Sequence, residues 1–118
     1  MAAFQFSSDG PLPVLSISGR IEPDHWKELK EALMEAAAKS AARNPKGALL
    51  VDLENLEYIA SSGFRELFLT GRHLAREERS LAVCSLKGEV KRVFQLASFA
   101  TVYPIFEDRA AAFAHFGV

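Results

Sequence analysis

Cysteine is almost missing from this sequence: Cys84 is the single cysteine among 118 residues. One thiol cannot form a disulfide within the chain, and so low a content is typical of proteins in a reducing compartment. Cys84 lies within the apolar run at residues 81–86. We therefore predict a buried, unreactive thiol and a cytoplasmic protein.

Long hydrophobic runs are missing as well. No segment approaches the roughly 18 consecutive apolar residues that a membrane-spanning helix requires. The first residues show no basic stretch followed by an apolar one, which is the pattern of a secretory signal peptide. We expect a soluble protein that does not insert directly into a membrane.

No charge of one sign dominates the sequence. The 14 lysine and arginine residues nearly balance the 15 aspartate and glutamate residues, which gives a formal net charge of −1. A nucleic-acid-binding domain usually carries a broad basic surface that attracts phosphate groups. The balanced charge therefore disfavours a nucleic-acid partner.

Motifs for catalysis and metal binding are scarce. The seven glycines are scattered and form no phosphate-binding loop, and no cluster of cysteine and histidine suggests a metal site. His25, His73 and His115 lie in predicted helices, outside any recognisable catalytic motif. Ser61 and Ser62 lie between a strand and a helix, as a hydrolase serine does, but the Gly-x-Ser-x-Gly motif is missing. We predict no enzyme activity, no cofactor and no metal.

What the sequence does contain is a large share of apolar residues in regular patterns. They make up 49% of the chain, which is enough for a hydrophobic core, and the length is typical of one domain spanning residues 1–118. Short strand-like runs alternate with longer runs at helical spacing. The predicted strands are residues 3–6, 12–18, 48–53, 81–86 and 101–106, and the predicted helices are residues 23–43, 61–75, 90–97 and 107–116.

This order, β-β-α-β-α-β-α-β-α, predicts an α/β fold built on one mixed sheet with about four helices. Helices between consecutive strands favour parallel pairing through right-handed crossovers. Turn residues at 7–11 predict a hairpin between the first two strands, which gives one antiparallel edge. Pro104 marks the last strand as an edge strand, because proline has no N–H to donate to the sheet. The pattern leaves open whether the helices cover one face of the sheet or both.

Two expectations concern the ends of the predicted helices. Trp26 lies on the apolar stripe of the first helix, and the turn chemistry of residues 44–47 ends that helix. After the second helix, residues 76–80 form a charged connector to the next strand. We expect Trp26 to point to the core.

The segment at residues 48–71 is the most informative part of the chain. Residues 48–53 form an almost continuous apolar run, which is typical of a strand buried on both faces. The serine pair Ser61 and Ser62 follows at a corner, and an apolar stripe at helical spacing begins at Phe64. The serines therefore lie at the start of a helix, where backbone N–H groups lack partners and the helix dipole is positive. Plain capping of the helix by these hydroxyl groups is one interpretation.

Three segments resemble the STAS domain, the fold shared by anti-sigma factor antagonists and the cytoplasmic tails of sulfate transporters. They are Gly19-Arg20-Ile21-Glu22, Leu50-Val51-Asp52-Leu53 and Ile59-Ala60-Ser61-Ser62-Gly63-Phe64, and the resemblance extends over essentially the whole chain. It implies a small cytoplasmic regulator without catalytic activity. In the antagonist branch, a partner kinase that is also the anti-sigma factor phosphorylates the serine at the position of Ser61. Phosphorylation breaks the complex, and a phosphatase restores it.

The resemblance also implies a partner-binding surface around this corner. Ser61 is the implied phosphorylation site, and Ser62 is the less favoured one. The implied partner contacts are Glu22, Asp24, Ser61, Ser62, Gly63 and Arg65. Glu22 lies in the loop that touches the kinase in the family, although an exposed turn acid explains it equally. Arg65, one turn into the helix, either pairs with a phosphate on Ser61 or faces solvent.

One departure from the family pattern favours a second interpretation. Antagonists commonly carry an aspartate before the phosphorylated serine, whereas this sequence has Ala60. The protein would then be an interaction module that is never phosphorylated. Such a module would be a subunit of a larger signalling assembly, or the accessory STAS subunit of a membrane transport complex.

Overall fold

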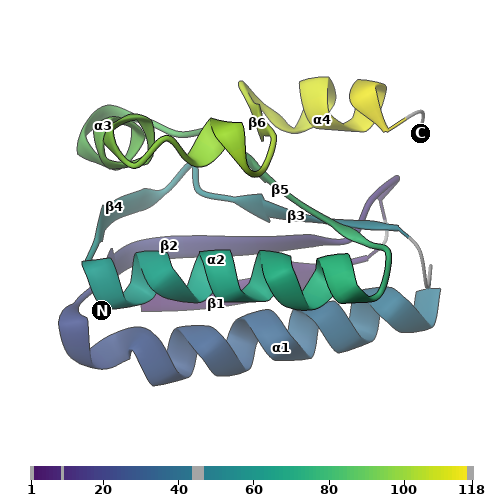
Figure 1. The fold of residues 1–118 in the computed structure, drawn as a ribbon, viewed down its shortest axis with the longest axis horizontal. Coiled ribbons are helices and arrows are strands. Elements are labelled where there is room, and N and C mark those ends of the chain that lie inside the picture. Colours follow the sequence, from purple (N-terminus) through teal and green to yellow (C-terminus); the bar gives the residue numbers. More distant parts are fainter. Residues whose placement is uncertain (1, 9, 44–46, 117–118) are drawn as a thin grey trace.

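The computed structural model describes residues 2–8, 10–43 and 47–116 (Figure 1). Its strands are β1 (Ala2–Ser7), β2 (Val14–Ile21), β3 (Ala48–Asp52), β4 (Leu56–Ile59), β5 (Ser80–Cys84) and β6 (Ile105–Phe106). Its helices are α1 (Trp26–Arg43), α2 (Ser61–Arg76), α3 (Gly88–Leu96) and α4 (Arg109–His115), with the 3-10 helices η1 (Pro23–His25) and η2 (Phe99–Thr101). Asp9 of the predicted turn and residues 44–46 of the predicted helix stop lie outside the described residues.

The strands form one mixed six-stranded sheet, which confirms the predicted α/β fold. β1 and β2 pair antiparallel, and β3, β5 and β6 follow β2 in parallel order. β6 is the last strand of this order, as Pro104 indicated. It is shorter than predicted, because Thr101 belongs to η2 and a turn at residues 102–103 follows before β6 begins.

β4 is a strand that the sequence pattern does not predict. It pairs in parallel with the second half of β2, where Ile21 lies opposite Ile59, while β3 pairs with the first half. In β4 only Leu56 and Ile59 are buried, and the two residues between them are exposed. Four residues with this spacing show neither strand alternation nor a continuous apolar run. β4 nevertheless positions the site, because it leads the chain directly to the serine corner.

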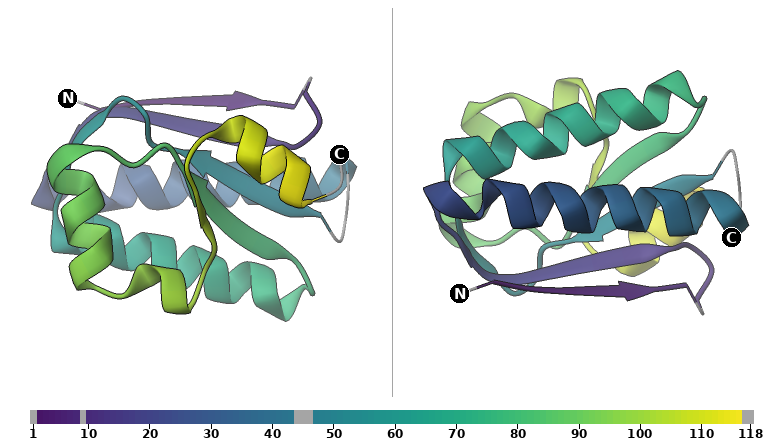
Figure 2. Two further views of the ribbon diagram at one scale, coloured as in Figure 1. Left: turned by 90° about the horizontal axis from the view of Figure 1, so that it is seen from above. Right: turned by 90° about the horizontal axis from the view of Figure 1, so that it is seen from below.

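The helices cover both faces of the sheet, which resolves the alternative that the pattern left open (Figures 1 and 2). α1 and α2 pack over the larger core, to which α3 also contributes and to which Leu49, Val51 and Val83 belong. α4 covers a smaller core on the opposite face, which contains Leu50 and Cys84. Adjacent residues of β3 and β5 thus point to different cores, as expected for strands buried on both sides.

A cluster of aromatic rings fixes α2 against α3 and η2. Phe64 and Phe68 of α2 contact Phe94, Phe99 and Tyr103, with ring centroids 4.7 to 5.8 Å apart. The Tyr103 hydroxyl also donates to the carbonyl oxygen of Phe68 at 3.0 Å. Aromatic pairs of this kind contribute about 0.5–1.5 kcal/mol each beyond the burial of their area. The helix that carries the serines therefore has a firmly packed underside.

The expectation for Trp26 is wrong, and one residue of the charged connector is buried. Trp26 is 41% exposed instead of facing the core, because residues 23–25 form η1 and α1 begins only at Trp26. Arg79 of the charged connector is 4% exposed, since its guanidinium donates to the carbonyl oxygens of Ala37 and Gly47 at 2.9 and 3.3 Å. A charged side chain tolerates burial only when its donors find such partners.

Candidate functional site

The site lies where β4 ends and α2 begins. Ile59 ends β4, Ala60 is the extended N-cap residue, and Ser61 is the first residue of α2. Ser61 is exposed, and within the described part of the chain its hydroxyl group has no hydrogen-bond partner. The corner thus presents an accessible hydroxyl at the positive end of a helix.

Ser62, by contrast, is held in place by its neighbours. Its side chain is half-buried, and its Oγ donates to the carbonyl oxygen of Pro23 at 3.0 Å. This bond joins the first turn of α2 to η1, 39 residues earlier in the chain. The capping interpretation is wrong for both serines, because the N-cap residue is Ala60 and no side-chain capping bond is present at this described helix end.

Gly63 is buried and therefore contributes to packing instead of to the surface. A Cβ atom at this position would lie 2.6 Å from Cγ2 of Ile21 and 3.2 Å from Cγ1 of Ile59. Such distances lie well inside van der Waals contact. Glycine at this position lets the first turn of α2 rest directly on the ends of β2 and β4.

Glu22 and Asp24 lie in the turn that leads into α1, beside the corner. Glu22 and His25 form a capping box, in which each side chain accepts from the backbone N–H of the other residue. The Glu22 carboxylate also pairs with Nε of Arg20 at 3.0 Å. The side chain of Asp24 is 88% exposed, and its contact with Nε2 of His25 is long, at 3.9 Å. Glu22 therefore stabilises the turn, while Asp24 presents its carboxylate to solvent.

A hollow of about 190 Å³ adjoins the corner on the α2 side. It is lined by Trp26, Ser62, Arg65 and Glu66. Arg65 is exposed and has no ion-pair partner among the described residues. It follows Ser61 by four residues in one helix, which places both side chains on the same side of α2. The exposed Trp26 ring gives this surface a large apolar group beside a free cation.

Trp26 is a member of this surface that sequence reasoning missed. Its spacing to Leu29 and Leu33 matches the core stripe of the helix, and both leucines are fully buried. Periodicity could not reveal that the stripe ends before Trp26. The residue type could have indicated a surface role, because tryptophan is over-represented among the residues that dominate protein interfaces.

A second hollow, of about 230 Å³, begins at the residue before the corner. Ile59 lines it together with Arg20, Tyr58 and Val93. The Arg20 guanidinium lies over the Tyr58 ring, with Cζ 4.6 Å from the ring centroid. Ile59 lines this hollow and Ser62 lines the first one. In the sequence, Ser61 therefore lies between a residue of each hollow.

The comparison with protein families identifies the fold. A family model described as "Mlab, STAS domain" matches residues 4–106. The chain belongs to the STAS domain family. This confirms the resemblance that the three sequence segments indicated.

One relative by sequence and two solved structures are similar to this STAS domain. The candidate anti-sigma factor antagonist BtrV of Bordetella bronchiseptica is 36% identical over 81 residues, which cover 67% of this chain and 70% of that protein. An anti-sigma factor antagonist from Mycobacterium paratuberculosis superposes with a TM-score of 0.83 at 23% identity, over 98% of this chain and 94% of its own. The Bacillus protein SpoIIAA, solved in its phosphorylated form, superposes with a TM-score of 0.68 at 16% identity, over 96% and 98% of the two chains.

The family relationship places this STAS domain with the anti-sigma factor antagonists, which are regulatory binding proteins and not enzymes. Within the described ranges, no helix is long and apolar enough to cross a bilayer. The same residues contain no group of three or more histidine, cysteine, aspartate or glutamate side chains able to hold a metal ion.

Proposed function

We propose that this STAS domain binds a serine-kinase anti-sigma factor in the cytoplasm, regulates transcription by sequestering it, and is switched by phosphorylation of Ser61. The observation that carries the proposal is the difference between the two serines. The Ser61 hydroxyl is exposed and unbonded within the described residues, whereas the Ser62 hydroxyl is bonded to Pro23. A kinase active site requires the accessible hydroxyl, so Ser61 is the favoured acceptor.

The corner can accept a phosphate group without unfolding. A phosphate on Ser61 adds about −1.5 to −2 charges at the N-terminus of α2, where backbone N–H groups and the helix dipole favour negative charge. Arg65 lies one turn further along the same helix and is free to pair with the phosphate oxygens. Phosphorylation is therefore compatible with the folded domain.

The same phosphate would disrupt a partner that docks on this corner. A kinase bound over Trp26, Asp24 and Ser61 would have to desolvate the new charge and accept it at a surface shaped for a neutral hydroxyl. A loss of about 1.4 kcal/mol already lowers the affinity tenfold. The switch would act through charge at the interface, and a cognate phosphatase would restore binding.

The test uses intact-mass measurement after incubation with ATP and each serine-kinase anti-sigma factor that the source genome encodes. The wild-type protein and the Ser62→Ala control should each gain one phosphate, and Ser61→Ala should gain none. A phosphatase from the same source should remove the phosphate and restore complex formation. Phosphate on Ser61→Ala, or none on the wild type with every kinase tested, would refute the proposal.

A second function is favoured by one specific observation, the alanine at position 60. Antagonists commonly have an aspartate there, and its loss removes a carboxylate that a partner kinase would recognise. The domain would then be a constitutive, non-phosphorylated subunit of a signalling assembly or a membrane transport complex. In that case Ser61→Asp should leave the affinity for co-purified subunits nearly unchanged, whereas a large loss would exclude this alternative.

A further inference from the structure

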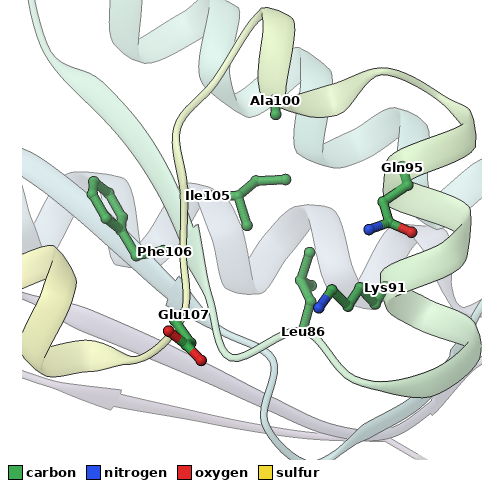
Figure 3. A pocket seen from close by; sticks show the side chains of 7 residues that line it. All are labelled: Leu86, Lys91, Gln95, Ala100, Ile105, Phe106 and Glu107. Carbon is green, nitrogen blue, oxygen red and sulfur yellow. The ribbon is translucent and has the colours of Figure 1, made fainter.

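A third hollow, of about 370 Å³, lies between α3, η2 and β6 (Figure 3). Its apolar lining comes from Leu86, Ala100 and Ile105. None of its lining residues belongs to the two hollows beside Ser61. Binding sites for small molecules usually have volumes of about 300–1,000 Å³, so this one suits a small ligand.

Polar groups of both signs face each other across this apolar lining. Lys91 and Gln95 lie four residues apart on α3 and therefore on one side of the helix. Glu107 reaches the rim from the opposite wall, directly after β6 (Figure 3). Within the described part of the chain, none of these three side chains has a hydrogen bond or ion pair. The hollow thus contains an unused cation and an unused carboxylate on opposite walls.

The backbone of β6 offers further polar groups beside the hollow. The amides of Val83 and Ser85 donate to the carbonyl oxygens of Pro104 and Phe106 at 3.1 and 3.2 Å. Because alternate residues of a strand pair in opposite directions, the N–H and carbonyl groups of Ile105 face the open edge of the sheet. That edge is only two residues long and follows a proline, so it is too short for a stable added peptide strand. The geometry favours a small molecule over a peptide.

We propose that this hollow binds a large hydrophobic α-amino acid. Its carboxylate would accept from Lys91 and Gln95, its ammonium group would donate to Glu107, and its side chain would pack on the apolar lining. Only a molecule that carries both a carboxylate and an ammonium group can pair with Lys91 and with Glu107. A plain carboxylic acid would leave Glu107 without a cation and place a second negative charge near it. A plain amine would leave Lys91 without an anion and place a second positive charge near it. The site is independent of the phosphorylation switch.

The test is an NMR titration of the isotopically labelled full chain with L-leucine as the probe. Saturable shifts should cluster at residues 86, 91, 95, 100 and 105–107, with a Kd of about 1 mM or below. Two analogues test the zwitterion requirement: 4-methylpentanoate lacks the ammonium group, and 3-methylbutylamine lacks the carboxylate. Each should bind at least about tenfold more weakly.

Variants locate the site. Lys91→Ala and Glu107→Gln should each weaken binding of L-leucine about tenfold, and Ala100→Phe should abolish it by filling the hollow. The matched controls Lys30→Ala and Glu31→Gln, on exposed positions of α1, should leave it unchanged. The proposal is wrong if L-leucine gives no saturable shift up to roughly 10 mM. Binding of 4-methylpentanoate as tight as that of L-leucine would equally overturn it, as would undiminished binding in both charge variants.

Discussion

Gly63 shows how a single residue sets the position of the serine corner. Gly63→Ala gains helix propensity of about 1 kcal/mol, but its methyl group would overlap Ile21, which lies 2.6 Å from the added atom. Overpacking of this kind costs about 1–3 kcal/mol, so we expect a net destabilisation of about 1 kcal/mol. Urea unfolding followed by circular dichroism measures it. Gly10→Ala is the control, because an added Cβ there has open space around it, with nothing within 4 Å among the described residues beyond its chain neighbours.

A variant Gly63→Ala as stable as the wild type would contradict this packing role. The role could not be predicted from the sequence, whose family resemblance implies a partner contact at Gly63. Its contact with Ile21 depends on the end of β2 meeting the first turn of α2, which is a tertiary arrangement.

Cys84 offers a second prediction at the residue scale. Burial raises the pKa of its thiol to about 11, and the nearby carboxylate of Asp52 adds to the effect. Only the thiolate reacts with alkylating agents, so at about pH 8 the reactive fraction falls roughly a hundredfold below that of an ordinary thiol. Iodoacetamide should leave the folded protein unmodified and alkylate it rapidly in urea. Equal rates in both conditions would show that the smaller core opens to solvent.

At the scale of elements, Arg79 joins three parts of the fold. Its guanidinium donates to Ala37 and Ser40 of α1 and to Gly47 before β3. In Arg79→Met the Ala37 carbonyl keeps the Ser40 hydroxyl as a donor, but Ser40 Oγ and the part-buried Gly47 carbonyl lose the guanidinium, which costs about 1–3 kcal/mol for each unsatisfied group. We expect a loss of about 2–4 kcal/mol. Thermal unfolding measures it, and Arg76→Met, at an exposed position of α2, should change stability by less than about 0.5 kcal/mol.

The elements that the sequence predicts well are those whose pattern is complete within one segment. β3 is a continuous apolar run, and α2 has a stripe of its own, so both could be located without knowledge of their neighbours. The strand β4 and the exposure of Trp26 could not be predicted, because each depends on a segment outside its own sequence pattern. β4 needs the second half of β2 as its partner, and Trp26 lies beyond the point where η1 ends the core stripe.

At the scale of the whole molecule, the packing around Ser61 predicts a switch without a change of shape. The larger core holds α2 through the aromatic cluster and Gly63, all on the buried side of the helix. Ser61 is on the outside, where the described residues offer no bond that a phosphate would break. A charge added there changes the surface and leaves the core contacts intact.

Ser61→Asp tests this separation between surface and core. The aspartate adds one charge at the start of α2, where the helix dipole favours it, so the free energy of unfolding should change by less than about 1 kcal/mol. The radius of gyration measured by small-angle scattering should also equal that of the wild-type protein. Affinity for the kinase partner should nevertheless fall at least about tenfold, with Ser61→Asn as the neutral control of similar size. An expanded variant, or one that loses stability together with affinity, would mean that the serine corner acts through the fold and not through its surface charge.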